Sequence, residues 1–419
     1  MPDLRVNAVN EVDHSRSEHR LIWALCLASI VVYINLYAVQ GMLPSIAEHF
    51  DVTGAKATLI LSVTSFSLAF SLLMYAVISD RIGRLAPIMV SLWLLVASNV
   101  LLIFAQDFDA LLMVRLLQGV LLAAVPAIAM AYFKDQLPAS FLLKAAGIYI
   151  MANSLGGIGG RLMGGLLSQY CTWEQAMTVN FAVTFIGITL VTYLLPRREL
   201  KPEKIKDSIG VLSKIKQDIG GFIYHLTDHQ MRLVYAIGGL AFMMMVNQFS
   251  FIQLHLMDDP YNFSRFAATL IFLCYLSGTL TSYFSSNWVV KFGVLRLFKG
   301  ALLVMLLGTL LTLMDNLAAI TLGFLLTASG FFLTHSCCNS FVAIRASTHR
   351  AKATSLYLCS YYLGASLGGP YLMLFWHQLE WQGVVIGSCG LLAFLSVAIM
   401  RLTYHQSKDI ELEKVVQAS

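Results

Sequence analysis

The sequence predicts an all-α membrane protein with twelve transmembrane helices in two pseudo-symmetric bundles of six. Hydrophobic residues make up 58% of the chain and charged residues only 12%, whereas soluble domains carry roughly a quarter charged residues. Twelve apolar stretches each approach the length of about 20 residues that crosses a bilayer. Two glycine-rich runs, 155–161 and 363–369, lie half a chain apart and indicate an internal duplication.

The predicted spans follow from cutting the chain at its charged and turn residues. They are 21–43, 58–78, 87–105, 110–132, 142–168, 175–195, 232–256, 266–288, 297–314, 317–341, 353–376 and 382–402. Six precede and six follow one long polar segment, which sets the domain organisation. This organisation is a tail (1–20), an N-terminal bundle (21–195), a central loop (196–231), a C-terminal bundle (232–403) and a second tail (404–419).

Glycines recur at every fourth residue in both runs, which allows two transmembrane helices to approach backbone to backbone. These predicted helix seams consist of Gly156, Gly160 and Gly164 in the first bundle and Gly364 and Gly368 in the second. Glycine-softened helices at matching positions of two halves are typical of secondary transporters.

Basic residues predict the orientation. With both termini cytoplasmic, all but four of the 28 Lys and Arg lie in inner loops and tails, as the positive-inside rule requires. Lys56 and Arg265 lie outside, and Arg115 and Arg161 lie within helices. The net charge of +5 therefore concerns topology, and we expect no nucleic-acid partner. A multi-pass protein of the bacterial inner (plasma) membrane is predicted.

No residue pattern indicates a cofactor, a metal site or enzyme chemistry. The seven cysteines are odd in number and nearly all lie in apolar stretches, where they are expected to pack as small apolar side chains. A phosphate-binding GxxxxGK[ST] loop does not occur, which argues against an ATP-driven pump. The expected partners are a small-molecule substrate, protons and the lipid bilayer, and the chain is expected to be a monomer.

The central loop contains apolar residues at steps of three and four with lysines between them. The apolar positions are Ile205, Ile209, Leu212, Ile215, Ile219 and Phe222. This pattern suits a basic amphipathic helix on the inner membrane face. A solvated tether between the bundles is the alternative.

Three motifs resemble the signature motifs of the major facilitator superfamily. They are Asp80-Arg81-Ile82-Gly83-Arg84 between the second and third helices, Arg115-Leu116-Leu117-Gln118-Gly119 in the fourth, and the glycines from Gly156 to Gly165 in the fifth. The resemblance covers nearly the whole chain. It implies a twelve-helix secondary transporter.

Shorter stretches are similar to the YnfM-type subgroup, which is assigned to proton-linked efflux. They are 36–40, 160–162, 335–336, 355–364 and 375–377. Two positions depart from the family pattern. Ala76 replaces a glycine, and Arg161 replaces the proline of typical antiporters, which removes one argument for antiport.

In the gating loop that the family resemblance implies, Asp80 is expected to accept hydrogen bonds from the amino end of a neighbouring helix. Arg81 and Arg84 then sit near helix carboxyl ends or lipid phosphates, and the loop latches the outward-facing state. Alternatively, the two arginines only fix the membrane orientation of this loop, as the positive-inside rule describes. The matching turn of the second half, 290–293, keeps a glycine and a base without the acid.

Arg115 and Arg161 are costly within the membrane, by at least about 2.5 kcal/mol each on insertion scales. Arg115 shares a helix face with Gln118. The two arginines could steer an organic anion or relay protons. A static pair with Asp107, Asp109 or Glu174, or snorkelling to the outer headgroups, is the alternative.

None of the 23 acidic residues lies near the middle of an apolar stretch. His335, with Asn339 one turn further along the same face, is the remaining ionisable group at mid-depth. Its unperturbed pKa near neutrality suits proton exchange. A neutral hydrogen-bonding role is equally open.

The cavity floor is predicted from helix faces. It comprises Tyr33, Tyr37 and Gln40 on the first helix, Asn247 and Phe251 on the seventh, and Tyr357 and Tyr361 on the eleventh. Tyrosines with a few amides suit a small polar or amphipathic organic molecule.

The leading prediction is a secondary active transporter that exports a small organic solute, sugar-like or drug-like, by alternating access as a proton antiporter. A proton-independent facilitator or exchanger of a small organic anion is the first alternative. A membrane sensor or scaffold that moves no solute is the second.

Overall fold

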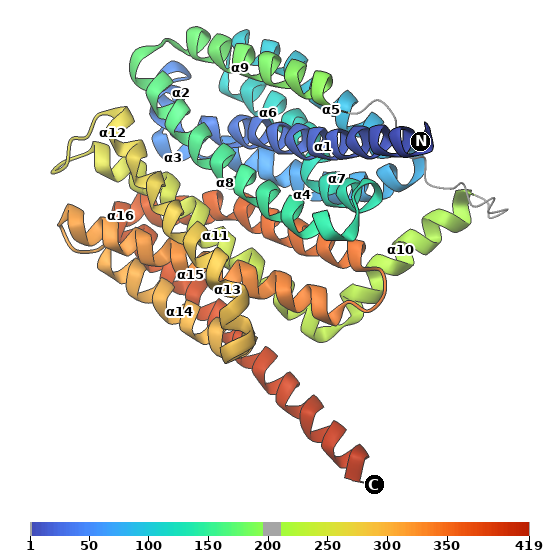
Figure 1. The fold of residues 1–419 in the computed structure, drawn as a ribbon. Helices are drawn as coiled ribbons and strands as arrows, with labels where there is room; N and C mark the ends of the chain where they lie inside the picture. The colour runs from blue at the N-terminus through green and yellow to red at the C-terminus, as the bar shows by residue number, and fades with distance from the viewer. Residues whose placement is uncertain (1, 196–210, 419) are drawn as a thin grey trace.

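The computed structural model describes residues 2–195 and 211–418, and these residues form helices joined by short turns. The N-terminal half lies beside the C-terminal half, and α10 crosses one end of both (Figure 1). The N-terminal helices are α1 (Pro2–Gly41), α2 (Leu43–His49), α3 (Gly54–Ala57), α4 (Leu59–Ile82), α5 (Leu85–Ile103), α6 (Phe108–Leu122), α7 (Ala124–Gln136), α8 (Ala139–Tyr170) and α9 (Trp173–Leu194).

The described part of the central segment contains the helix α10 (Val211–Thr227). The C-terminal helices are α11 (His229–Met257), α12 (Arg265–Thr269), the 3₁₀ helix η1 (Leu270–Cys274), α13 (Tyr275–Phe292), α14 (Val294–Leu311), α15 (Leu317–Arg345) and α16 (Arg350–Ala418). Part of the predicted amphipathic helix, including Ile205 and Ile209, falls outside the described residues.

The twelve predicted spans are present. Within the described residues, 10 helices are long and apolar enough to cross a membrane. The last of them, in α16, holds two spans, because Leu379 and Glu380 leave the helical conformation and turn the chain. The fifth predicted span corresponds to α8, a helix of 32 residues.

The fourth span is broken between α6 and α7, which its hydropathy does not show. Pro126 lies in the first turn of α7. A proline ring clashes with the carbonyl four residues earlier, here that of Leu122, and α6 ends at that residue. The break bends the helix where Arg115 and Gln118 face the interior.

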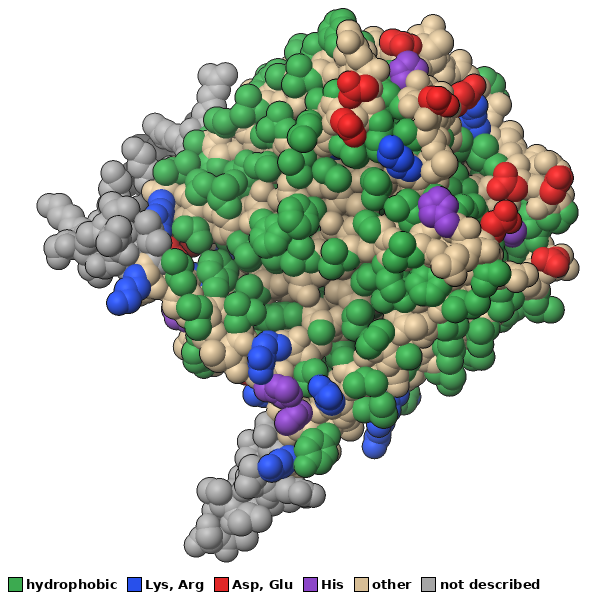
Figure 2. Space-filling model, turned by 180° about the vertical axis from the view of Figure 1, so that it is seen from behind, with side chains coloured by type: hydrophobic (Ala, Val, Ile, Leu, Met, Phe, Trp, Pro, Cys, Tyr) green, Lys and Arg blue, Asp and Glu red, His purple; other side chains and the backbone are tan. Residues whose placement is uncertain are grey.

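Charged side chains divide between the two ends of the molecule (Figure 2). We call the end formed by the turns at or near Glu48, Asp107, Glu174, Asp258 and Asp315 the acidic end, and the end formed by the turns at or near Arg81, Arg84, Lys134, Lys291 and Arg345 the basic end. Exposed apolar side chains cover the surface between them, including Phe70, Met113 and Leu374. This girdle is the surface that lipid contacts in a membrane protein.

The predicted glycine seams are real helix contacts, and each lies within one half. A Cβ atom on Gly156 or Gly160 of α8 would lie 2.8 Å from backbone atoms of Ile30 or Ile34 of α1. A Cβ atom on Gly364 of α16 would lie closer still to the backbone of Gly239 in α11. The duplication therefore repeats one packing geometry, the first helix of each half on its fifth.

Candidate functional site: the seam between the halves

Arg115 lies inside the N-terminal half, 1% exposed. Its Nε donates to Thr64 Oγ1 (3.0 Å), and Nη1 donates to Gln118 Oε1 (2.6 Å) and to the Asn35 carbonyl (3.1 Å). Nη2 donates to the Leu36 carbonyl at 3.2 Å. These acceptors are neutral, so Arg115 neither snorkels nor pairs with the acids considered above. Asp107 instead caps α6.

A buried amide network extends from Arg115 across the N-terminal half. Gln118 Nε2 donates to Asn99 Oδ1 (2.8 Å), and Asn99 Nδ2 donates to Asn35 Oδ1 (2.8 Å). Asn180 and Thr184 complete it on α9. Asn99 and Asn180 were not among the residues predicted from the sequence, although amides within apolar stretches were a usable signal.

Arg161 lies at the seam between the halves, 2% exposed. Its Nε donates to Gln40 Oε1 on α1 (2.8 Å), and its Nη1 donates to the Gly157 carbonyl (2.9 Å). Its Nη2 reaches Tyr275 Oη in the other half at 3.4 Å. The guanidinium carbon also lies 3.7 Å from the ring centroid of Tyr37 and 4.5 Å from that of Tyr275.

Gln40 also forms hydrogen bonds to the C-terminal half. Its Nε2 donates to the Val246 carbonyl (2.9 Å) and to Ser250 Oγ (2.7 Å) on α11. Asn247, which was predicted to line the pathway, donates to the Ala365 carbonyl at 3.1 Å and is 1% exposed. It therefore joins α11 to α16.

Hydrogen bonds between the halves gather toward the acidic end. Gln253 Nε2 donates to the Gly41 carbonyl at 3.1 Å, and Arg265 donates to the Ser168 carbonyl at 3.1 Å. Arg265 also pairs with Glu48. These residues lie at or near the ends of α1, α8 and α11, so the halves are tied together at the acidic end.

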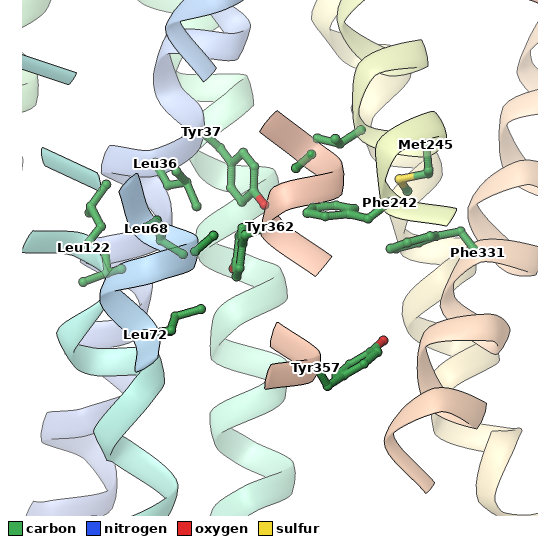
Figure 3. Packing of buried hydrophobic residues seen from close by; sticks show 14 of the residues in the cluster. Leu36, Tyr37, Leu68, Leu72, Leu122, Phe242, Met245, Phe331, Tyr357 and Tyr362 are labelled. Atoms are coloured by element: carbon green, nitrogen blue, oxygen red, sulfur yellow. The ribbon is translucent and has the colours of Figure 1, made fainter. Parts of the chain in front are cut away.

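Tyrosines lie at the seam further toward the basic end, and a histidine of the C-terminal half lies behind them. Tyr33 Oη and Tyr362 Oη, from opposite halves, lie 3.2 Å apart. Tyr361 stacks on Phe242 with centroids 3.7 Å apart and lies 4.9 Å from the ring of His335. Figure 3 shows Tyr37 and Tyr362 facing each other between α1 and α16, with Phe242 beside them on α11.

His335 has a partner at each ring nitrogen. Asn339 Nδ2 lies 3.1 Å from Nε2, and Tyr357 Oη lies 2.7 Å from Nδ1. An amide nitrogen only donates, so Nε2 is the acceptor and the proton of the neutral ring lies on Nδ1. His335 and Asn339 are each partly exposed. A proton added at Nε2 would displace the Asn339 amide.

The gating loop forms ion pairs at the basic end. Asp80 accepts from Arg84 Nη1 (2.5 Å), and Arg84 Nε donates to Asp135 (2.9 Å). Arg81 pairs with Asp218 of α10 at 2.7 Å. Gly83 has a φ of 95°, a conformation that favours glycine, as does Gly293 at 79° in the matching turn.

Two bundles of six helices, packed alike and meeting over a polar and aromatic seam, define a polytopic membrane transporter fold. The family model of the Major Facilitator Superfamily matches residues 25–368 and 234–418. The chain belongs to this superfamily and is a non-enzymatic membrane transporter of that type.

Relatives and solved structures agree with this assignment. The chain is 33% identical over 396 residues to the MFS-type transporter YybF of Bacillus subtilis, covering 94% of this chain and 95% of the relative. It is 32% identical over 372 residues to the inner membrane transport protein YnfM of Escherichia coli, covering 87% and 86%.

The fold is similar to that of a mutant form of the nucleoside transporter NupG. The TM-score is 0.75 at 13% identity, covering 91% of this chain and 99% of that one. A bacterial homologue of the lysosomal transporter Spinster, inward-facing and occupied, gives 0.68 at 16% identity, covering 93% and 97%.

Proposed function

We propose that this protein exports a small organic solute by alternating access, in exchange for protons. The observation that carries the proposal is the placement of the bonds between the halves. Direct hydrogen bonds tie the halves toward the acidic end, through Gln40, Gln253 and Arg265. At the basic end Asp218 links Arg81 to Lys352 through α10. Halves that bond directly at one end, and through an intervening helix at the other, fit one of the two states that alternating access requires.

The basic end is the cytoplasmic end in this proposal, and the acidic end is the outer one. The positive-inside rule supports this assignment, because basic loops remain on the cytoplasmic side. The described state is then inward-facing with a closed outer gate. The Asp80 latch belongs to the opposite state and stays a prediction.

His335 is the proton-exchanging group in the proposal. It is titratable, partly exposed and in contact with Tyr361, which lies near Tyr33 and Tyr37 of the other half. Protonation would break its Asn339 contact and change the polar surface that a solute meets. Through this surface the proton and the solute would influence each other's binding.

A proton-independent facilitator of an organic anion is the second candidate. The ion pairs recorded in the described ranges lie at the two ends of the molecule, and none places a carboxylate at mid-depth. Export of an anion is favoured by an inside-negative membrane potential, by about 2.3 kcal/mol per charge for each 100 mV. Such a transporter needs no proton.

Two-sided labelling tests alternating access. Ser336→Cys places a thiol beside His335, on a background with the seven native cysteines replaced by serine or alanine. We expect a small membrane-impermeant thiosulfonate to label it from either side of sealed vesicles. Labelling from one side only, at every pH, would contradict transport and favour a sensor or scaffold.

A further inference from the structure

Arg161 is the most deeply buried cation that touches both halves. Its side chain, on α8, contacts α1 through Gln40 and α13 through Tyr275. The contact to Tyr275 is 3.4 Å, close to the limit of a hydrogen bond. The bonds to Gln40, Gly157 and Tyr275 therefore engage three of the five N–H groups of a guanidinium, one of them weakly, and the Tyr37 hydroxyl also interacts with it.

The charge of Arg161 has no anionic partner among the described residues. Arg84, Arg265 and Arg345 are more exposed, and each pairs with a carboxylate. Arg115 also lacks an anion, but four bonds to neutral acceptors satisfy it inside one half. Burial of an unpaired charge is costly. Arg161 thus keeps the capacity to bind an anion at the point where the halves meet.

Aromatic rings surround the guanidinium. Tyr37, Tyr275 and Phe272 place their ring centroids 3.7, 4.5 and 5.2 Å from its carbon atom. Cation–π contacts compensate part of the missing counter-charge. The same rings offer flat apolar walls to the carbon skeleton of a ligand. A planar guanidinium flanked by aromatic rings is suited to bind the carboxylate of a small organic molecule.

Gln40 connects this site to the outer gate. Its Oε1 accepts from Arg161, while its Nε2 holds Val246 and Ser250 of the other half. An anion on the guanidinium competes with Oε1 for the same donor. Displaced from Arg161, Gln40 loses the geometry that ties α1 to α11.

We infer that the transported solute is a small organic anion whose carboxylate-type group binds Arg161 in place of Gln40, and that this exchange loosens the outer gate. The inference rests on the proposed function and names its substrate class. Asn153, Gly157 and Arg161 share one face of α8. Asn153 is partly exposed and lies about two helical turns from Arg161 toward the basic end.

Thermal unfolding of the purified full chain tests the inference. Benzoate, phenylacetate and hexanoate are each compared with the corresponding amide, which has nearly the same shape and no charge. We expect at least one carboxylate to raise the midpoint more than its amide, because only ligands of the folded state stabilise it. Arg161→Gln should weaken that carboxylate about ten- to one-hundred-fold, the range for a lost charge-assisted bond.

Two further variants keep the test decisive. Arg161→Lys retains the charge but lacks the paired N–H donors of the guanidinium, and it should bind the carboxylate about tenfold more weakly than the wild type. This variant replaces Arg161→Gln if Arg161→Gln does not fold. Arg296→Gln, an exposed basic-end control, should bind like the wild type. The inference is overturned if no carboxylate exceeds its amide, or if both Arg161 variants bind unchanged. If the inference is overturned in this way but Ser336→Cys is labelled from both sides, the proposed function still stands.

Discussion

At the scale of the residue, the two membrane arginines have different surroundings. Arg115 is held by backbone carbonyls and amides of one half, whereas Arg161 spans the seam with one weak bond to the other half. Hydropathy and spacing treat them alike, since both interrupt an apolar helix. Their partners come from distant segments, which one helix's sequence does not reveal.

The amide network makes a stability prediction. Asn35→Ala removes an Oδ1 that accepts from Asn99 and a side chain that donates to Thr184. Buried donors left unsatisfied cost about 1–3 kcal/mol. The unfolding midpoint in detergent should therefore fall clearly. Thr189→Ala is the control, because Thr189 donates only to its own helix and should change stability by less than about 0.5 kcal/mol.

His335 makes a pH prediction. The proposal requires that its protonation shifts the balance between states within about pH 4–8, the range that exposed and buried histidines together cover. Spin labels at Lys134→Cys and Ser347→Cys, on the cysteine-free background, report the separation of the halves at the basic end. The wild-type distance distribution should change across this range. His335→Gln should leave it constant, and an equal response in both proteins would remove His335 from the coupling scheme.

At the scale of the element, hydropathy predicted where the spans lie but not where the helices begin and end. The fifth span, expected at 142–168, is Ala139–Tyr170, and the tenth, expected at 317–341, is Leu317–Arg345. Helices continue into polar residues, where hydropathy falls although the backbone bonds persist. Caps such as Thr172, which accepts from Gln175 N, set those ends.

The helix seam predicts a local packing effect. Gly160→Ala places a Cβ 2.8 Å from Ile34 Cα, so α1 and α8 must separate. Overpacking of this kind typically costs about 1–3 kcal/mol. The neighbouring Gly159→Ala is a matched control, because nothing lies within 4 Å of its added Cβ. Gly160→Ala should lower the unfolding midpoint and Gly159→Ala should not; equal midpoints would contradict the seam.

Asp218 of α10 forms a bridge whose strength should depend on pH. Burial raises the pKa of this carboxyl, but Lys352 and Arg81, at 2.9 and 2.7 Å, outweigh burial and hold it below its usual range. A lowered pKa means that the bridge is present at neutral pH and is lost as the pH falls through that lowered value.

Asp218→Asn should therefore accelerate amide hydrogen exchange in α10 at neutral pH, because the helix loses its ties to both halves. Lys216→Gln, an exposed change in the same helix, is the control and should exchange like the wild type. Unchanged protection in Asp218→Asn would show that apolar contacts alone hold α10.

At the scale of the whole molecule, the duplicated architecture has become functionally asymmetric. The N-terminal half contains Arg115, Arg161 and the amide network, and the C-terminal half contains His335 with its tyrosines. The sequence alone shows which half contains each of these residues. It could not predict that Gln40 joins the two halves, because that contact depends on how the halves pack.

The distance between the halves at the acidic end tests alternating access most directly. Spin labels at Asp109→Cys and Asp315→Cys, both exposed, lie next to the starts of α6 and α15 in opposite halves. In lipid nanodiscs we predict two distance populations, with the longer one increased by a carboxylate that binds Arg161. A single short distance at every pH and with every carboxylate would contradict the account.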